Sequence, residues 1–226
     1  MSCMAAMVPP NDLQSTAFQA LAIASGACWG IAYFLIIRRG IPDRSYGIPA
    51  VAVCVNISWE FVFTFLIPHE SPQWYVNFAW FLLDLFILGQ VLFFWRSDFP
   101  YLEGVIFCPF AAVSLVASFG LIFTMAVELE DCNLYSAFGQ NYLMSILFLT
   151  MLFHRNSLRG QSIYIAISKM AGSALACIIS YLFVPLAQEL VVLRYIFVAI
   201  VLFDLSYIAA VYYFGRKQGT PVWTRL

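Results

Sequence analysis

Long apolar stretches separated by short polar segments run through the whole chain. Each is close to the roughly 20 residues that a helix needs to cross the hydrocarbon layer of a membrane. Charges, proline or glycine bound each stretch, as is typical of membrane helices. We therefore predict seven spans, at residues 17–37, 48–67, 74–95, 105–127, 134–153, 163–184 and 191–214. The expected fold class is all-α: a polytopic bundle of about seven transmembrane helices, with residues 1–226 as a single membrane-embedded domain.

Composition excludes a water-soluble fold. Hydrophobic residues make up 63% of the 226 residues and charged residues only 10%, against about 45–50% and 25% in soluble domains. The net charge of −1 comes without any basic face, so we expect the lipid bilayer as a partner and no nucleic acid. The sequence leaves the oligomeric state open.

The cysteines stand singly, without a CxxC pair, and most lie in apolar stretches: Cys3, Cys28, Cys54, Cys108, Cys132 and Cys177. Buried thiols of this kind behave as small core residues. We predict no metal, no cofactor and no disulfide framework. A bridge between Cys3 and Cys132 remains a minor alternative, because both would lie on the same side of the membrane.

Basic residues predict the orientation of the chain. Nine lie in the loops after the odd-numbered spans or in the tail: Arg38, Arg39, Arg44, Arg96, Arg155, Arg159, Arg216, Lys217 and Arg225. The opposite side has only Arg194. The positive-inside rule then puts the C-terminus in the cytoplasm and the N-terminus in a lumen, with the endoplasmic reticulum as the expected membrane. The acidic group Glu128, Glu130 and Asp131 becomes a solvated lumenal turn.

Two stripes of small residues at four-residue spacing predict close helix packing. They are Ala22/Gly26/Gly30 in the first span and Ser168/Gly172/Ala176/Ser180 in the sixth.

Four ionisable residues lie inside predicted spans: Glu60, Asp84, Lys169 and Asp204. Each costs about 2.5–3.5 kcal/mol at the middle of a helix in lipid, so each needs a partner or a function. Lys169 lies near the cytoplasmic end of its span, and we expect it to extend toward the membrane surface, with one carboxylate as an additional partner.

The three acidic residues lie near the same membrane depth and are expected to share one cavity. At least one should be protonated at neutral pH, which is the state that a general acid requires. Asn56 precedes Glu60 by one helical turn, and Tyr207 follows Asp204 by one turn, so each can orient its carboxyl group. The alternative is a hydrogen-bond network that only fixes helix packing.

Aromatic residues are abundant, at 18% of the chain. Five lie near the acidic positions in the middle of spans: Trp29, Trp59, Phe63, Trp80 and Phe81. Ring faces stabilise cations, so these residues are candidates for substrate contact, although core packing alone explains them too.

Several short sequence motifs, taken together, indicate a protein family. Residues 56–63 read Asn-Ile-Ser-Trp-Glu-Phe-Val-Phe, after Ser-Tyr-Gly-Ile-Pro at 45–49. Cys28-Trp29, the segment from Trp80 to Asp84, and Phe-Asp-Leu-Ser-Tyr at 203–207 add to this pattern. The chain resembles, over nearly its whole length, the fungal membrane-bound terpene cyclases of meroterpenoid and indole-diterpene pathways.

The resemblance implies an enzyme that protonates the terminal epoxide of a prenylated, farnesyl-type precursor and guides its cationic cyclisation. In that family the acid of the Trp-Glu motif and the last-span aspartate are the catalytic pair, which fall on Glu60 and Asp204, and Asp84 matches a third acidic position. Substrate contacts would come from Asn56, Trp59, Trp29, Phe63, Trp80, Phe81 and Tyr207.

The residues fit this chemistry independently, since neither DDxxD nor DxDD occurs in the chain and an epoxide needs neither metal nor diphosphate. The alternative is a seven-helix transporter with a 3+1+3 repeat, indicated by Leu-Asp-Leu at 83–85 and Phe-Asp-Leu at 203–205. Pro72-Gln73 is a weak further match to a transporter motif.

Overall fold

The computed structural model describes residues 15–69, 71, 73–129 and 133–226. Within these ranges every regular element is a helix. The helices are α3 (Thr16–Asp43), α4 (Ala50–Phe61), the π-helix η1 (Val62–Leu66), α5 (Gln73–Phe94), the 3₁₀-helix η2 (Trp95–Ser97), α6 (Gly104–Glu128), α7 (Leu134–Arg155), α8 (Ile163–Phe183), the short α9 (Pro185–Glu189) and α10 (Val191–Lys217).

The all-α membrane bundle is confirmed. Each predicted span overlaps one long helix, except 48–67, which α4 and η1 form together. Six of the described helices are long and apolar enough to cross a membrane. The seventh segment, Ala50–Leu66, is shorter; at about 1.5 Å per residue it extends for roughly 25 Å. Helices α3 and α10 run further than the predicted spans, to Asp43 and Lys217.

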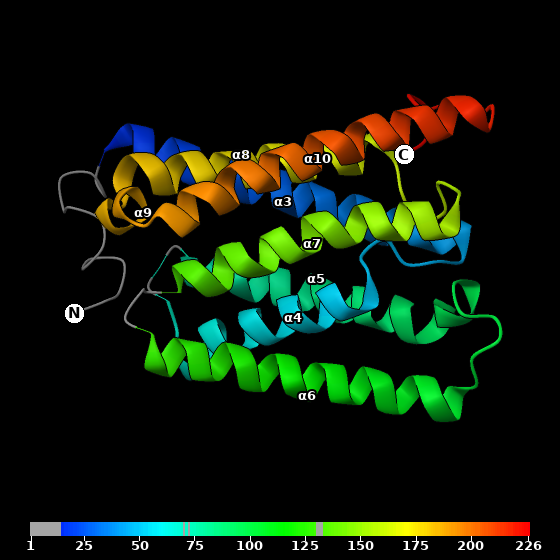
Figure 1. The fold of residues 1–226 in the computed structure, drawn as a ribbon, viewed down its shortest axis with the longest axis horizontal. Helices are drawn as coiled ribbons and strands as arrows, with labels where there is room; N and C mark the ends of the chain where they lie inside the picture. Colours follow the sequence, from blue (N-terminus) through cyan, green and yellow to red (C-terminus); the bar gives the residue numbers. More distant parts are fainter. Residues whose placement is uncertain (1–14, 70, 72, 130–132) are drawn as a thin grey trace.

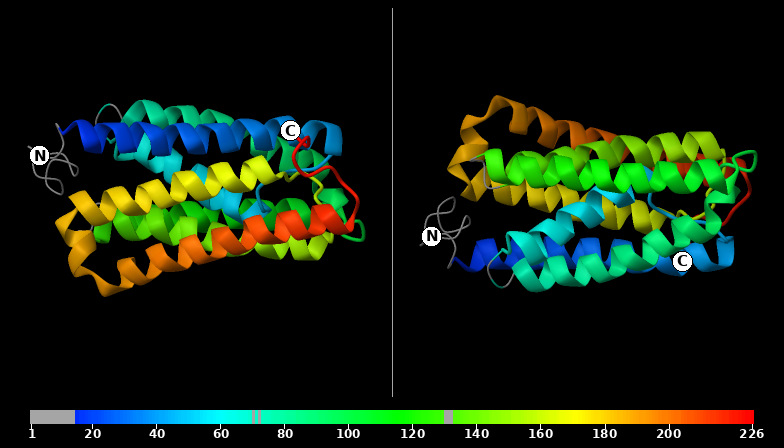
Figure 2. Two further views of the ribbon diagram at one scale, coloured as in Figure 1. Left: turned by 90° about the horizontal axis from the view of Figure 1, so that it is seen from above. Right: turned by 90° about the horizontal axis from the view of Figure 1, so that it is seen from below.

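The long helices lie roughly along one axis (Figure 1). Helix α3 packs against α8 and α5, and α10 packs against α7 and α8. The short α4 contacts α5, α6 and α7, so it lies inside the bundle, and the views in Figure 2 agree. This position explains why nearly every residue of α4 from Ala52 to Glu60 is buried. Outward-facing side chains elsewhere are apolar, such as Phe86 on α5 and Val113 on α6, as a lipid-facing surface requires.

One predicted small-residue stripe meets its neighbour closely. Ser25 Oγ on α3 donates to the Gly172 carbonyl oxygen on α8 at 2.9 Å. A Cβ atom at Gly172 would lie 2.6 Å from Trp29 Cδ1, so only glycine admits the indole here. Gly26 instead faces Val76 of α5, and Gly30 has no neighbour within 4 Å.

The C-terminal ends of α3, α5, α7 and α10, in or beside which the predicted basic residues stand in the sequence, lie at the end of the bundle where the C-terminus is found (Figure 1). The start of α3 lies at the opposite end. Two buried or half-buried aspartates hold this end together. Asp98 pairs with Arg155 at 2.6 Å and with Arg159 at 3.0 Å. Asp43 pairs with Arg39 and, at 2.6 Å, with Arg225 of the tail.

Some sequence predictions fall on residues that the structure does not describe: Cys3, Pro72, Glu130, Asp131 and Cys132. The remaining cysteines, Cys28, Cys54, Cys108 and Cys177, are free thiols.

Candidate active site

A cavity of about 140 Å³ lies among α3, α4, α5, α7 and α8. Its walls carry both polar and aromatic side chains. They are Ser25, Trp29, Tyr33, Asn56, Trp59, Glu60, Trp80, Ala137, Phe138, Gln140, Asn141, Met144 and Ala176. Five of the residues predicted from the sequence therefore meet here: Trp29, Asn56, Trp59, Glu60 and Trp80.

Glu60 is held by a chain of hydrogen bonds across two helices. Asn56 Nδ2 donates to the Tyr33 hydroxyl oxygen at 3.0 Å, and that hydroxyl donates to Glu60 Oε1 at 3.2 Å. Glu60 is 2% exposed, and its second oxygen, Oε2, has no hydrogen-bond partner among the described residues. Asn56 thus orients Glu60 through Tyr33 rather than by the direct contact that the sequence suggested.

Asp84 lies against the same group. Its carboxyl group is fully buried and interacts with Glu60, Asn56 and Tyr33. Neither of its oxygens reaches hydrogen-bond geometry with a described residue. No salt bridge to Glu60 or Asp84 occurs in the described part of the chain. Two ionised carboxylates placed together without a cation would repel each other, so this arrangement favours a shared charge of less than two.

The ring residues form a continuous wall. Tyr33 lies between Trp29, with ring centroids 6.0 Å apart, and Trp80, at 6.3 Å. Trp59 is fixed by a hydrogen bond from its Nε1 to Ser136 Oγ at 3.1 Å. Indole and phenol faces placed around one cavity are suited to stabilising a cation inside it.

The three other predicted contact residues do not line this cavity. Phe63 stacks on His69 with centroids 4.9 Å apart. Phe81 packs with Phe61 and Phe65 on the outer side of α4 and η1. Tyr207 is fully buried against Phe148.

Asp204 belongs to a second buried cluster, so the expectation that the three acidic residues share one cavity is wrong. Glu60 lines the cavity, Asp84 interacts with Glu60 without lining it, and Asp204 does neither. Lys169 Nζ lies 2.5 Å from Asp204 Oδ1 and 2.8 Å from Ser145 Oγ. Both charged side chains are 1% exposed. The prediction that Lys169 extends to the membrane surface is therefore wrong, whereas the additional prediction of a carboxylate partner is confirmed. Trp29 connects this ion pair to the cavity wall, because its ring centroid lies 5.7 Å from Lys169 Nζ.

The helix carrying Glu60 changes to a π-helix directly after it. A π-helix leaves carbonyl groups without their usual partners, and such segments occur often at functional sites. Here Asn77 Nδ2 donates to the Phe63 oxygen at 3.4 Å, and Trp74 Nε1 donates to the Thr64 oxygen at 3.0 Å. These two bonds fasten η1 to α5, which carries Asp84.

Sequence reasoning missed the most central residue, Tyr33. It follows Trp29 by one helical turn, so its place on the same face of α3 was readable. The α7 wall, with Gln140 and Asn141, had no such signal, because uncharged polar residues in a span do not stand out.

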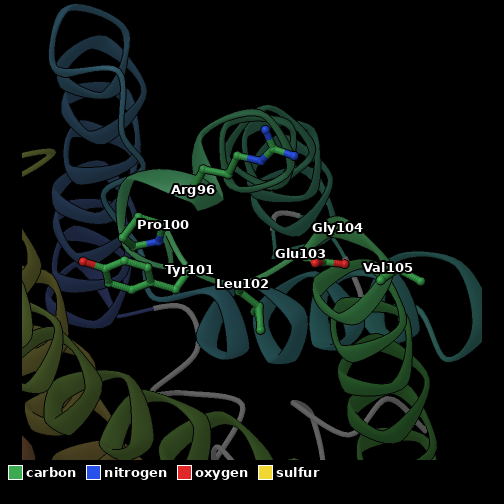
Figure 3. A pocket seen from close by; sticks show the side chains of 7 residues that line it. All are labelled: Arg96, Pro100, Tyr101, Leu102, Glu103, Gly104 and Val105. Carbon is green, nitrogen blue, oxygen red and sulfur yellow. The ribbon is translucent and has the colours of Figure 1, made fainter.

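A second, larger pocket of about 490 Å³ lies at the basic end (Figure 3). Its lining comes from η2 and the loop into α6, including Arg96, Tyr101 and Glu103. Tyr101 is 99% exposed, and none of the buried acidic residues reaches this pocket. It is a surface feature, separate from the acidic cavity.

The described residues contain no group of three or more potential metal ligands. The polar side chains that line the cavity carry one carboxyl, a phenol, amides and a serine hydroxyl, and the Asp84 carboxyl lies against Glu60 outside this lining. Such groups suit proton transfer. The arrangement can present an acid to a substrate in an aromatic cavity.

Comparison with known proteins identifies the family. Residues 3–218 match the profile of the Pyr4-like transmembrane terpene cyclases. The chain is 33% identical over 162 residues to the Pyr4-family terpene cyclase mfmH of Annulohypoxylon moriforme, covering 69% of this chain and 66% of that protein. It is 29% identical over 156 residues to terpene cyclase pyr4 of Aspergillus fumigatus, covering 67% and 65%. It is 24% identical over 160 residues to asnovolin H synthase nvfL of Aspergillus novofumigatus, covering 68% and 65%.

The matched part of the chain thus spans about two thirds of the length of these curated relatives. The family profile, in contrast, covers nearly all of this chain and includes every residue of the cavity. This protein therefore belongs to the Pyr4-like transmembrane terpene cyclases, a family of multi-pass membrane enzymes.

Proposed function

We propose that this terpene cyclase acts on the terminal epoxide of a prenylated, farnesyl-type meroterpenoid precursor. The observation that carries the proposal is Glu60: a buried carboxyl group at a cavity wall, beside a second carboxyl and without a cationic partner among the described residues. A carboxyl in these surroundings is suited to remain a neutral acid.

In the proposed reaction Glu60 donates its proton to the epoxide oxygen as the carbon–oxygen bond breaks. The alkene electrons of the prenyl chain then form the new carbon–carbon bonds one after another. Trp29, Trp59 and Trp80 stabilise the successive cations through their ring faces. The last cation loses one proton to give an alkene, so the product is an isomer of the substrate.

The size of the cavity indicates which part of the substrate enters it. Its volume of about 140 Å³ is similar to that of an engineered cavity of about 150 Å³ that accommodates benzene. One end of a prenyl chain fits such a space, whereas the whole precursor does not. We infer that the epoxide end binds beside Glu60 while the head group lies outside the cavity.

The two remaining acids have different proposed roles. Asp84 lies against Glu60, and its nearby carboxyl disfavours a second negative charge, which keeps Glu60 available as an acid at neutral pH. Asp204 is separated from Glu60 and neutralises Lys169, whose ammonium group lies over Trp29. We therefore assign Asp204 to the support of the cavity wall, in place of the second acid that the family resemblance implies.

For the membrane we propose the endoplasmic reticulum, with the start of α3 on the lumenal side and the C-terminus in the cytoplasm. The support is that nine basic residues stand in the loops and the tail at the helix ends nearest the C-terminus, against Arg194 at the other ends.

The decisive experiment compares Glu60→Gln with the wild type in microsomes given a panel of epoxidised prenylated aromatic and polyketide substrates. Products of unchanged mass report cyclisation. Glutamine keeps the size of the side chain but carries no acidic proton, so the rate should fall by more than the about 10²–10⁴-fold typical of a general acid. The matched control is Glu103→Gln at the surface pocket, which should retain wild-type activity.

A Glu60→Gln protein that accumulates normally and still cyclises would make the assignment wrong and would turn attention to Asp84. Chelation is a second arm of the same experiment. Turnover should survive EDTA, and activity that disappears with EDTA and returns with Mg²⁺ would contradict epoxide protonation.

A further inference from the structure

Tyr33 connects Asn56 to Glu60 by hydrogen bonds, and the reaction proposed above gives it no role. It is 3% exposed and lies on α3, whereas Asn56 and Glu60 lie on α4. Its hydroxyl oxygen accepts a hydrogen bond from Asn56 Nδ2 and donates its own proton to Glu60 Oε1. The hydroxyl group therefore acts both as an acceptor and as a donor.

The direction of this chain determines where the acid proton of Glu60 can be. An amide nitrogen is only a donor, so the Tyr33 oxygen must accept from Asn56. The single Tyr33 proton then points to Glu60 Oε1, which must accept it. A protonated carboxyl that accepts at one oxygen carries its proton on the other. That oxygen, Oε2, has no hydrogen-bond partner among the described residues.

We propose that Tyr33 is a positioning residue that holds Glu60 with its acid proton on Oε2, ready for transfer to the epoxide. The inference rests on the proposed role of Glu60 as the acid. Two consequences follow for the reaction. Before transfer, the bond from Tyr33 keeps the carboxyl group in one orientation. During transfer, negative charge develops on Glu60, and the same bond becomes charge-assisted and stronger.

The test uses Tyr33→Phe in the full-length enzyme in lipid, with Tyr142→Phe as the matched control. Tyr142 packs against Phe203, away from the cavity lining, and loses the same hydroxyl. Loss of one charge-assisted bond should lower kcat about 10- to 100-fold. KM should change less than about threefold, because the ring still fills its place. The control should change neither constant.

Infrared spectroscopy gives a readout that packing alone would not move. The carbonyl stretching band of the Glu60 acid is the band that disappears in Glu60→Gln. A hydrogen bond to Oε1 lowers the frequency of this stretch, so the band should move to higher frequency in Tyr33→Phe and stay in place in Tyr142→Phe. An unmoved band in Tyr33→Phe overturns the inference, since Glu60 would then donate to Tyr33 instead.

Tyr33→Phe leaves the Asn56 amide without its acceptor, so the variant can fail to accumulate. Asn56→Ala is then measured in the same two ways, because Tyr33 without its donor can turn away from Glu60. It should give a smaller fall in kcat and the same direction of band shift. Wild-type kcat in either accumulating variant also overturns the inference. Activity in Glu60→Gln would instead reject the proposed acid itself, so the two failures are distinguishable.

Discussion

The ion pair of Lys169 and Asp204 gives the sharpest prediction about stability. Lys169→Met removes the ammonium group but keeps an unbranched side chain of similar length. It leaves the Asp204 carboxylate, 1% exposed, without the cation that lies 2.5 Å away. Breaking a buried ion pair by removing one partner costs about 3–5 kcal/mol. Since about 1.4 kcal/mol is a factor of ten, the unfolded fraction should rise by about 10²- to 10⁴-fold.

The assay is the heat resistance of the purified protein in detergent, followed by the fraction that stays monodisperse after heating. In Lys169→Met most of the monodisperse fraction should be lost at temperatures at which the wild type stays monodisperse. Lys217→Met, which removes the other lysine of the chain at an exposed position, should behave as the wild type does. Heat resistance of Lys169→Met equal to that of this control would refute the reasoning.

The double variant Lys169→Met/Asp204→Asn separates support from catalysis. It removes both charges, so heat resistance should return to near that of the wild type. If Asp204 only neutralises Lys169, cyclisation should return to within about tenfold of the wild type. A double variant that is stable but inactive would show that Asp204 has a chemical role of its own.

Three further predictions address other parts of the chain. Burial lowers the pKa of His69 to about 4. Between about pH 6.5 and 4 the unfolded chain therefore binds a proton that the folded chain does not. As the pH is lowered through this window, the free energy of unfolding should decrease by at most about 3 kcal/mol. Thermal unfolding against pH checks this: His69→Gln should remove the dependence, whereas His154→Gln, an exposed histidine, should keep it. Gly172→Ala should displace the Trp29 indole and lower kcat/KM about 10- to 100-fold, measured against Gly120→Ala, which faces open space; equal rates would show that the indole position is unimportant. A reporter fused to the C-terminus should read cytoplasmic and one fused to the N-terminus lumenal, and two reporters on the same side would contradict the orientation.

Most of the fold could be predicted from the sequence, because a membrane helix is recognised from its own local stretch of residues. A run of apolar residues specifies a span by its own length, without reference to any partner. The helix boundaries differ by a few residues, mainly where α3 and α10 continue beyond the lipid into the basic end. What the runs did not reveal is that Ala50–Leu66 is short and internal, since burial by protein and burial by lipid select the same apolar residues.

The acidic positions were also readable, because a charge within a span is costly and therefore conspicuous. The family resemblance, borne out by the match over residues 3–218, decided for a cyclase where the residues alone had left a transporter open. It also directed attention to Glu60, but not to the partners of Glu60.

Those partners depend on contacts between distant helices, which composition and spacing do not encode. The sequence by itself determined a membrane bundle, its family and the carboxyl groups that need an explanation. The tertiary structure alone decided that Asp84 joins Glu60, that Asp204 joins Lys169, and that Tyr33 connects Asn56 to Glu60. The physical reason is that a buried charge must find a partner somewhere in the bundle, while only the packing of one helix on another determines which partner is within reach.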